Sequence, residues 1–484
     1  MSKTSRAVQT LMALEDAAPG ELFEEISEIG IPLWPLVRQD FGAAFADEET
    51  GAVGISRTAN AWEVRRRLAK ALLPSRWDAR GFRGRRDVCF LVGGNTTTHV
   101  AGKEGNWLIG DFAEQAADRS VVFQWRALPS EYGAPAFRAT RSLDPALARA
   151  DFAAHRRPPS ATTIETVGRL VDRFAELVEA PMDEARLADV KASAMKLISL
   201  QIPMKDEINR ILDHVQPRIV LFEDGSYGYR GAYIAQIRSQ GALVAEPQHG
   251  WIGGAHVAYN YGAAYAQPPL ARTLPEELLT FGDLWSESIR HPARLTSIGK
   301  PHLERRAAAA SRDRAREVLV VSSVADPAET DEFVLQLRSS LPSDWSVRFR
   351  PHPGERDMVD TRYPRIASSP DVELDMDPDV YDSLSRARVV VGVASTVLFE
   401  AAAFSCQVIV RDTSFAEFIV GDTFGERVRS AEEAVARVLA EETADLAHGA
   451  TDSGLWADAP TERFTAWLDD RLSGRSTAPT SPAE

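Results

Sequence analysis

The sequence predicts an α/β protein with two domains, each a doubly wound parallel sheet, that face each other across a cleft. Three observations predict this fold class. The chain of 484 residues is long enough for two to four domains. Short apolar runs of strand length alternate with helical stretches, which is the pattern of a parallel sheet covered on both faces. The alternation pauses near residue 302 and resumes near residue 317, which predicts two such units.

The first domain is predicted to span residues 1–302, to begin with a mostly helical region and to lie on the acceptor side of the cleft. Apolar runs bounded by turn signals occur in three places: VCFLVGG at 88–94, IVLFEDG at 219–225 and ALVAEPQHG at 242–250. Residues 161–216 carry apolar side chains at helical spacing between the first and second of these runs. We therefore expect buried strands joined by helices.

The second domain is predicted to span residues 315–430. Four strand-like runs, at 317–324, 346–355, 389–396 and 407–412, are separated by helical segments. Residues 431–472 have helical periodicity and are expected to form C-terminal helices. Residues 473–484, which end in GRSTAPTSPAE, are low in complexity and are expected to be disordered.

The composition excludes several classes of function. The formal net charge is −15, from 55 basic and 70 acidic residues, so we expect no nucleic-acid partner. Cys89 and Cys406 are the only cysteines, too few for a disulfide framework or a four-thiolate zinc site. The chain has no apolar run of transmembrane length and no signal-peptide pattern at its start, which predicts a cytoplasmic protein. Metal-ligand spacing is absent, so we expect no metal and no cofactor.

Residues 61–86 form a basic segment in this acidic chain. They carry nine basic residues against two acids, and Trp62, Leu68 and Leu72 can share one side of a short helix. Two interpretations stay open. The segment is either a solvated helix packed on the core, or a basic amphipathic element that touches anionic lipid at the inner face of the membrane.

Polar residues at two strand ends of the second domain predict a nucleotide site. Arg350 and His352, in the sequence RPHP, follow one strand and suit a phosphate as fixed cation and donor. Ser395 and Thr396 follow the next strand, where a helix start can bind an anion. Glu400, one turn further, can accept from ribose hydroxyls. A strand cap and an ordinary helix N-cap are the alternatives.

Two strand ends of the first domain offer candidate general bases. Glu223 and Asp224 follow IVLF, and either carboxylate could take a proton from an attacking hydroxyl. The alternative for this pair is a helix N-cap. His249 lies between a glutamine and a glycine after the next strand and is a second candidate base or phosphate donor. His256 is expected to be structural. The chain contains no GxSxG, P-loop, HExxH or GxGxxG motif.

The order FGDLW, SIGKPHLE, RPHP and ASTVLFEAAAF resembles the carboxyl half of GT-B fold glycosyltransferases. It is most similar to bacterial surface-polysaccharide enzymes, namely the CDP-glycerol glycerophosphotransferases of teichoic acid synthesis and the bacterial sialyl-, polysialyl- and Kdo-transferases. The first resemblance implies that His249 and His352 are catalytic and phosphate-binding histidines. The second implies a base in the pair Glu223 and Asp224, with His352 holding the phosphate of CMP. Trp251 follows QHG where the glycerophosphotransferases continue HGTP, and the motifs cover about residues 220–412.

The resemblance implies a metal-independent transferase for capsule or teichoic acid synthesis. It would move a sugar or polyol phosphate from a nucleotide-activated donor, such as a cytidine-linked sugar or CDP-polyol, to a hydroxyl of a surface glycan or lipid-linked acceptor. We expect Asp224 to be the base, with Glu223 and His249 as competitors. A nucleotide-sugar epimerase of the related two-domain fold is the alternative enzyme, and an inactive binding scaffold is the alternative without catalysis.

Overall fold

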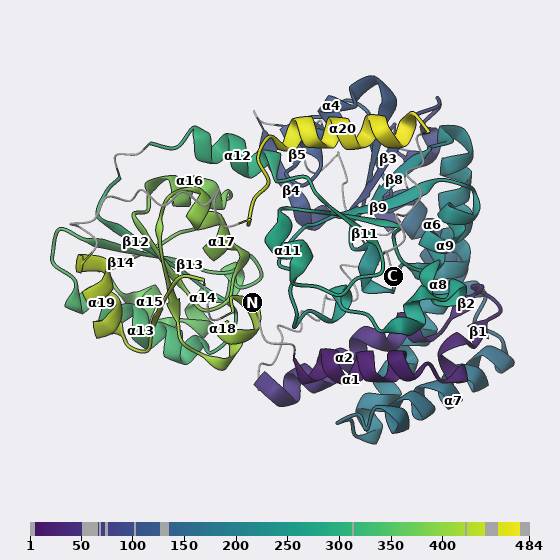
Figure 1. The fold of residues 1–484 in the computed structure, drawn as a ribbon, viewed down its shortest axis with the longest axis horizontal. Coiled ribbons are helices and arrows are strands. Elements are labelled where there is room, and N and C mark those ends of the chain that lie inside the picture. Colours follow the sequence, from purple (N-terminus) through teal and green to yellow (C-terminus); the bar gives the residue numbers. More distant parts are fainter. Residues whose placement is uncertain are drawn as a thin grey trace, which may run out of the picture.

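The computed structural model describes residues 5–50, 66, 69–72, 76–100, 103–125, 135–311, 314–421, 424–440 and 454–474. It confirms the predicted fold class, since two α/β domains, each with its own parallel sheet, lie side by side in Figure 1. None of the helices that the structure describes has the length and apolar character needed to cross a bilayer.

The first domain is built on a seven-stranded sheet of order β11-β10-β9-β8-β3-β6-β7, with every described pair parallel. The strands are β3 (Val88–Val92), β6 (Ser120–Gln124), β7 (Thr140–Ser142), β8 (Ile219–Phe222), β9 (Leu243–Pro247), β10 (Glu277–Thr280) and β11 (Arg294–Ser297). The central strands β3 and β8 are buried along their whole length, because helices cover both faces of the sheet.

The second domain is built on a six-stranded parallel sheet of order β14-β13-β12-β15-β16-β17. The strands are β12 (Glu317–Val321), β13 (Ser346–Arg350), β14 (Val372–Leu374), β15 (Val389–Gly392), β16 (Gln407–Arg411) and β17 (Glu426–Val428). The chain order reverses between β12 and β15. In open parallel sheets, ligands bind beyond the carboxyl ends of the two strands at such a reversal.

Helices pack on both sheets. They are α1 (Arg6–Ala17), α2 (Trp34–Thr50), α4 (Gly110–Gln115), α6 (Asp144–Arg156), α7 (Ala161–Leu177), α8 (Glu184–Val215), α9 (Gly231–Ser239), α10 (Pro268–Ala271), α11 (Asp283–Glu287), α12 (Pro301–Ala308), α13 (Pro327–Ser340), α14 (Val359–Arg362), α15 (Pro364–Ser368), α16 (Val380–Arg386), α17 (Thr396–Ala403), α18 (Ser414–Ile419), α19 (Ala431–Ala440) and α20 (Pro460–Leu472). Two antiparallel hairpins complete the fold: β1 (Glu25–Ile26) with β2 (Ile31–Pro32), and β4 (Thr97–Val100) with β5 (Lys103–Asn106).

The stretch 161–216, with its helical periodicity, forms two helices. Ser160 caps α7 by accepting from the backbone N–H of Thr163, and Asp183 caps α8 in the same way at Arg186. Both helices pack with α1 and α2 into one apolar cluster that includes Trp34 and Phe174. In Figure 1, α1, α2 and α7 lie below the sheet of the first domain.

The two helices at the C-terminal end belong to different domains. Helix α19 packs on α13 of the second domain. Helix α20, yellow in Figure 1, returns to the first domain, where Phe464 stacks on Phe112 at 4.3 Å between ring centroids. Trp467 Nε1 donates to the buried carboxylate of Glu277 at 2.7 Å. The chain thus crosses between the domains twice. Most of the expected disordered tail lies outside the described residues.

Candidate functional site

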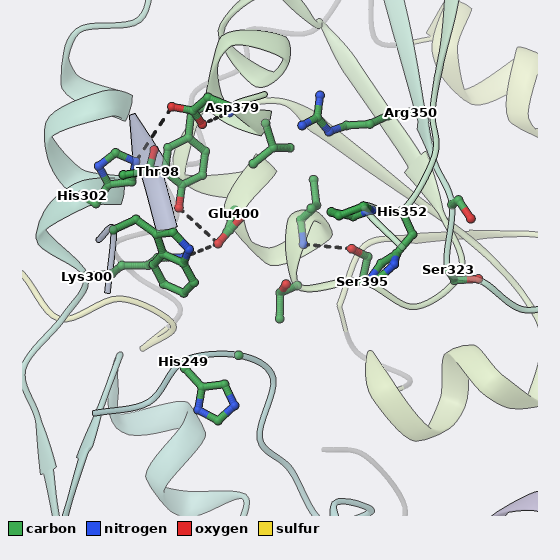
Figure 2. Close-up of a pocket in the computed structure, with 18 of the residues that line it drawn as sticks. Thr98, His249, Lys300, His302, Ser323, Arg350, His352, Asp379, Ser395 and Glu400 are labelled. Carbon is green, nitrogen blue, oxygen red and sulfur yellow. Dashed lines mark hydrogen bonds and ion pairs between the residues drawn. The ribbon is translucent and has the colours of Figure 1, made fainter. Parts of the chain in front are cut away.

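A cavity of about 550 Å³ lies between the two domains. It occupies the carboxyl ends of β12 and β15, where the strand order predicts a ligand. Figure 2 shows His249 on one side of the cavity and His352 with Ser395 on the other. Six of the predicted site residues are among those that line it: His249, Arg350, His352, Ser395, Thr396 and Glu400.

The second domain supplies the polar wall of the cavity. Ser395 is the N-cap of α17, and its hydroxyl accepts from the backbone N–H of Val397 at 3.2 Å. Thr396 opens the helix beside it, so both hydroxyls and the positive end of the helix border the cavity. The helix start can therefore be an ordinary N-cap and an anion site at once.

The RPHP loop brings one imidazole and one guanidinium to the cavity, and buried partners hold the guanidinium. The ring Nδ1 of His352 accepts from the backbone N–H of Gly354 at 3.1 Å, so the neutral ring carries its proton on Nε2 as a donor. Arg350 is 6% exposed and donates to Asp375 at 3.1 Å and to Ser383 at 3.1 Å. Its charge is thus already balanced by a buried carboxylate.

A buried glutamate that sequence reasoning missed fixes this loop. Glu355 is fully buried and accepts from Ser322 Oγ at 2.5 Å and from Tyr363 at 2.7 Å. Arg362 balances the charge of Glu355 at 2.8 Å. The Oε2 atom of Glu355 also accepts from the backbone N–H of His352 at 3.3 Å. The loop after β13 is therefore tied to the end of β12. The signal for it was the acid three residues after the histidine, in RPHPGE.

Glu400 meets the other domain in the cavity wall. It forms an ion pair with Lys300, and Tyr381 donates to the same carboxylate at 3.2 Å. Lys300 also lies over the Trp107 ring at 4.2 Å from its centroid. Lys300 is a further residue of the site that sequence reasoning did not assign, although it stands in the quoted SIGKPHLE. The pair links the first domain to α17.

In the first domain, Asp224 lies directly behind His249. The carboxylate Oδ1 is 3.2 Å from His249 Nε2. Its Oδ2 accepts from Tyr229 at 3.0 Å and from Arg230 at 3.3 Å. Asp224 is not among the residues that line the cavity, whereas His249 is. The structure thus joins two of the three competing base candidates into one pair.

The other ring nitrogen of His249 faces a buried acid. Its Nδ1 has no hydrogen-bond partner and is 3.9 Å from Glu246 Oε1. Glu246 is fully buried, accepts from Ser226 and Tyr259, and its burial raises the pKa to about 8. Burial also lowers the pKa of His249, and Asp224 opposes that shift. A neutral imidazole at pH 7, which can take up a proton, follows from these directions.

Glu223 points to a different place. It is 2% exposed and accepts from the backbone N–H of Gly93 and from Thr96 at 3.4 Å, at the end of β3. Burial, with Asp224 nearby, raises its pKa to about 7. The structure therefore places this carboxylate against the first loop of the sheet, and not among the residues that line the cavity.

Several remaining predicted features have internal partners. The imidazole of His256 accepts from the backbone N–H of Ala258 at 3.2 Å and meets Tyr227 at 3.3 Å. Both cysteines are buried and free. In the basic segment, Arg80 pairs with the buried Glu207, while residues 61–65, 67, 68 and 73–75 lie outside the described residues. No group of metal-binding side chains occurs in the part of the chain that the structure describes.

No protein-family model and no curated protein matches the chain in sequence. Solved structures resemble it at low identity. One is the UDP-GlcNAc 2-epimerase from Methanocaldococcus jannaschii in complex with UDP-GlcNAc and UDP, at 11% identity and a TM-score of 0.46, covering 79% of this chain and 99% of that one. A putative UDP-N-acetylglucosamine 2-epimerase from Listeria monocytogenes has 13% identity, a TM-score of 0.46 and coverages of 80% and 97%.

An Anabaena protein solved in complex with UDP and glucose has 11% identity, a TM-score of 0.39 and coverages of 80% and 95%. None of these three structures is named as a glycerophosphotransferase or a sialyltransferase, so that resemblance stays a prediction. The fold of the chain is assigned from its two parallel sheets and not from these solved structures.

Proposed function

We propose that the protein is an enzyme that acts on a nucleotide-activated sugar or polyol and breaks its bond to the nucleotide phosphate. One observation carries the proposal. An imidazole backed by a carboxylate, His249 with Asp224, borders the same cavity as the anion-binding start of α17. A proton acceptor and a phosphate site on opposite walls are what displacement of a nucleotide requires.

The second domain would hold the nucleotide. Hydroxyls of Ser395 and Thr396, the N-terminus of α17 and the Nε2 donor of His352 would bind the phosphate. These groups would stabilise the negative charge that grows on the phosphate oxygen as it leaves. Glu400 would accept from a ribose hydroxyl while it keeps its contact with Lys300.

His249 is the better candidate for the base, and Asp224 for the group that orients it. Asp224 does not line the cavity, and its Oδ2 already accepts from Tyr229 and Arg230, whereas His249 lines the cavity. In transfer, His249 would take the proton of the attacking hydroxyl on Nδ1, which has no hydrogen-bond partner, and this nitrogen would have to turn from Glu246 toward the cavity. The hydroxyl oxygen bonds to the transferred group, and the nucleotide phosphate oxygen leaves with the electron pair of the broken bond.

Epimerisation is the second candidate function. A cavity of about 550 Å³ is in the range that encloses one small ligand, and an epimerase needs only the nucleotide sugar. His249 would then remove a proton from the carbon beside the one that loses the phosphate, and return of a proton to the opposite face of that carbon and of the phosphate oxygen to its neighbour would give the epimer. The two epimerase structures described above are named for that activity. An inactive scaffold is the remaining alternative, and the positioned His249–Asp224 pair argues against it.

Two measurements, made one after the other, test the proposal. Thermal shift with CMP, CDP, UDP and GDP should find one nucleotide that stabilises the protein, by about 2.7 kcal/mol at 100 times its dissociation constant. The matching activated sugar is then incubated without acceptor, and the products are separated. An epimer identifies an epimerase, and reaction only after a glycan acceptor is added identifies a transferase. Binding with neither product identifies a scaffold and overturns the proposed catalysis.

A further inference from the structure

A second cavity, of about 320 Å³, adjoins the first. The hairpin β4–β5 and the start of α4 form much of its wall. Three residues border both cavities, namely Thr98, Trp107 and His302. A group bound in the second cavity would therefore be separated from the first by the thickness of these side chains.

The side chains of the second cavity suit a ligand rich in hydroxyl groups. Trp107 and Phe137 offer apolar ring surface, and Gln124 and Thr140 offer groups that both donate and accept. Gln124 is 3% exposed, and its Nε2 donates to Thr97 at 2.8 Å, so its amide is held in one orientation. Apolar walls with a few fixed polar groups are typical of small-molecule sites.

The charge of this cavity opposes a second nucleotide. Three carboxylates line it, Glu104, Asp111 and Glu114, against the single guanidinium of Arg305, which pairs with Asp111. Burial, with Lys300 nearby, lowers the pKa of His302 to about 4, so this imidazole is neutral at pH 7. The net negative charge here would repel a phosphate, whereas it would not repel a neutral sugar.

We propose that the second cavity binds a neutral sugar or polyol unit of the acceptor. This inference rests on the proposed function, because it requires the first cavity to hold the activated donor. It makes the protein an enzyme of two substrates, with the acceptor hydroxyl reaching His249 past Trp107 and Thr98.

A cavity-filling variant tests the site. Gly110 lines the second cavity, and a Cβ there would meet no atom within 4 Å, so the first side-chain atom of Gly110→Leu has open space. Gly168, in α7 on the far helical layer, is equally open, and Gly168→Leu is the matched control. Both changes replace a helical glycine with a better helix former, so each should fold.

The probes are glycerol, glucose, galactose and N-acetylglucosamine, and binding is read by saturation-transfer NMR. We expect at least one probe to bind the wild type and the Gly168→Leu variant, and its signal to fall at least tenfold in Gly110→Leu. Nucleotide affinity, measured by calorimetry, should be equal in all three proteins. Absence of signal from every probe, or an unchanged signal in Gly110→Leu, overturns the inference. Failure of every nucleotide to bind overturns the proposed function instead.

Discussion

Asp224 and His249 come from the ends of neighbouring strands, β8 and β9, and their contact at 3.2 Å changes the role that each can have. The sequence placed both residues at one edge of a parallel sheet, because both follow apolar runs. It could not show which of the two reaches the cavity, since that depends on the left-handed backbone of Asp224, at φ 58°. Glu246 was missed because a single acid inside an apolar strand gives no pattern.

The pH profile of Asp224→Asn shows which of Asp224 and His249 is the base and which is its partner. The Asp224 carboxylate raises the pKa of His249 against the effect of burial. If His249 is the base, activity rises with pH as this imidazole loses its proton. Removing the carboxylate lowers the pKa of His249, so the acidic limb of kcat/KM should move to lower pH while turnover falls. A variant inactive at every pH would instead make Asp224 the base, as the sialyltransferase resemblance implies.

His352→Ala tests the phosphate contact. If Nε2 of His352 donates to the leaving phosphate, turnover should fall by roughly 10²–10³, the loss seen when one donor to a developing oxyanion is removed. The side chain is exposed, so the melting temperature should not change. Wild-type turnover in a variant with an unchanged melting temperature would remove His352 from the reaction.

Among the elements, continuous apolar runs were predicted best. The runs around β3, β8, β12 and β15 are buried along their length, and burial on both faces is what such runs indicate. Strand β7 has three residues, TRS, too short and polar to give a strand signal. The return of α20 to the first domain depends on contacts such as Trp467 with Glu277, which no local pattern contains.

Contact of the basic segment 61–86 with anionic lipid remains a prediction, and vesicle binding tests it. If the segment touches anionic lipid, the protein should sediment with vesicles of anionic lipid at low salt and detach at high salt. Replacing Arg65, Arg66 and Arg67 with Gln should weaken that binding.

The control for vesicle binding replaces two exposed arginines at the end of α6, Arg156 and Arg157, with Gln, which lowers the charge elsewhere. Equal sedimentation of all three proteins, or sedimentation that does not depend on lipid charge, would leave the segment as a solvated surface of the fold.

At the scale of the whole molecule, one buried ion pair joins the domains. Lys300 and Glu400 are 7% and 6% exposed. Lys300→Met should leave the Glu400 carboxylate buried without its cation and destabilise the protein by about 3–5 kcal/mol. The double variant Lys300→Met with Glu400→Gln should recover most of the loss, as read from thermal unfolding. Equal stability of the single variant and the wild type would show that the domains are held by other contacts.

In the proposed reaction, the two walls of one cavity act on the same bond, and His249→Gln tests this most directly. The measurement is single-turnover release of nucleotide from the activated sugar that the screen identifies. The wild type should release it, and the variant should bind the same compound with equal affinity but release it roughly 10²–10⁴ times more slowly. Release by the variant at the wild-type rate would show that His249 does not take part in breaking this bond.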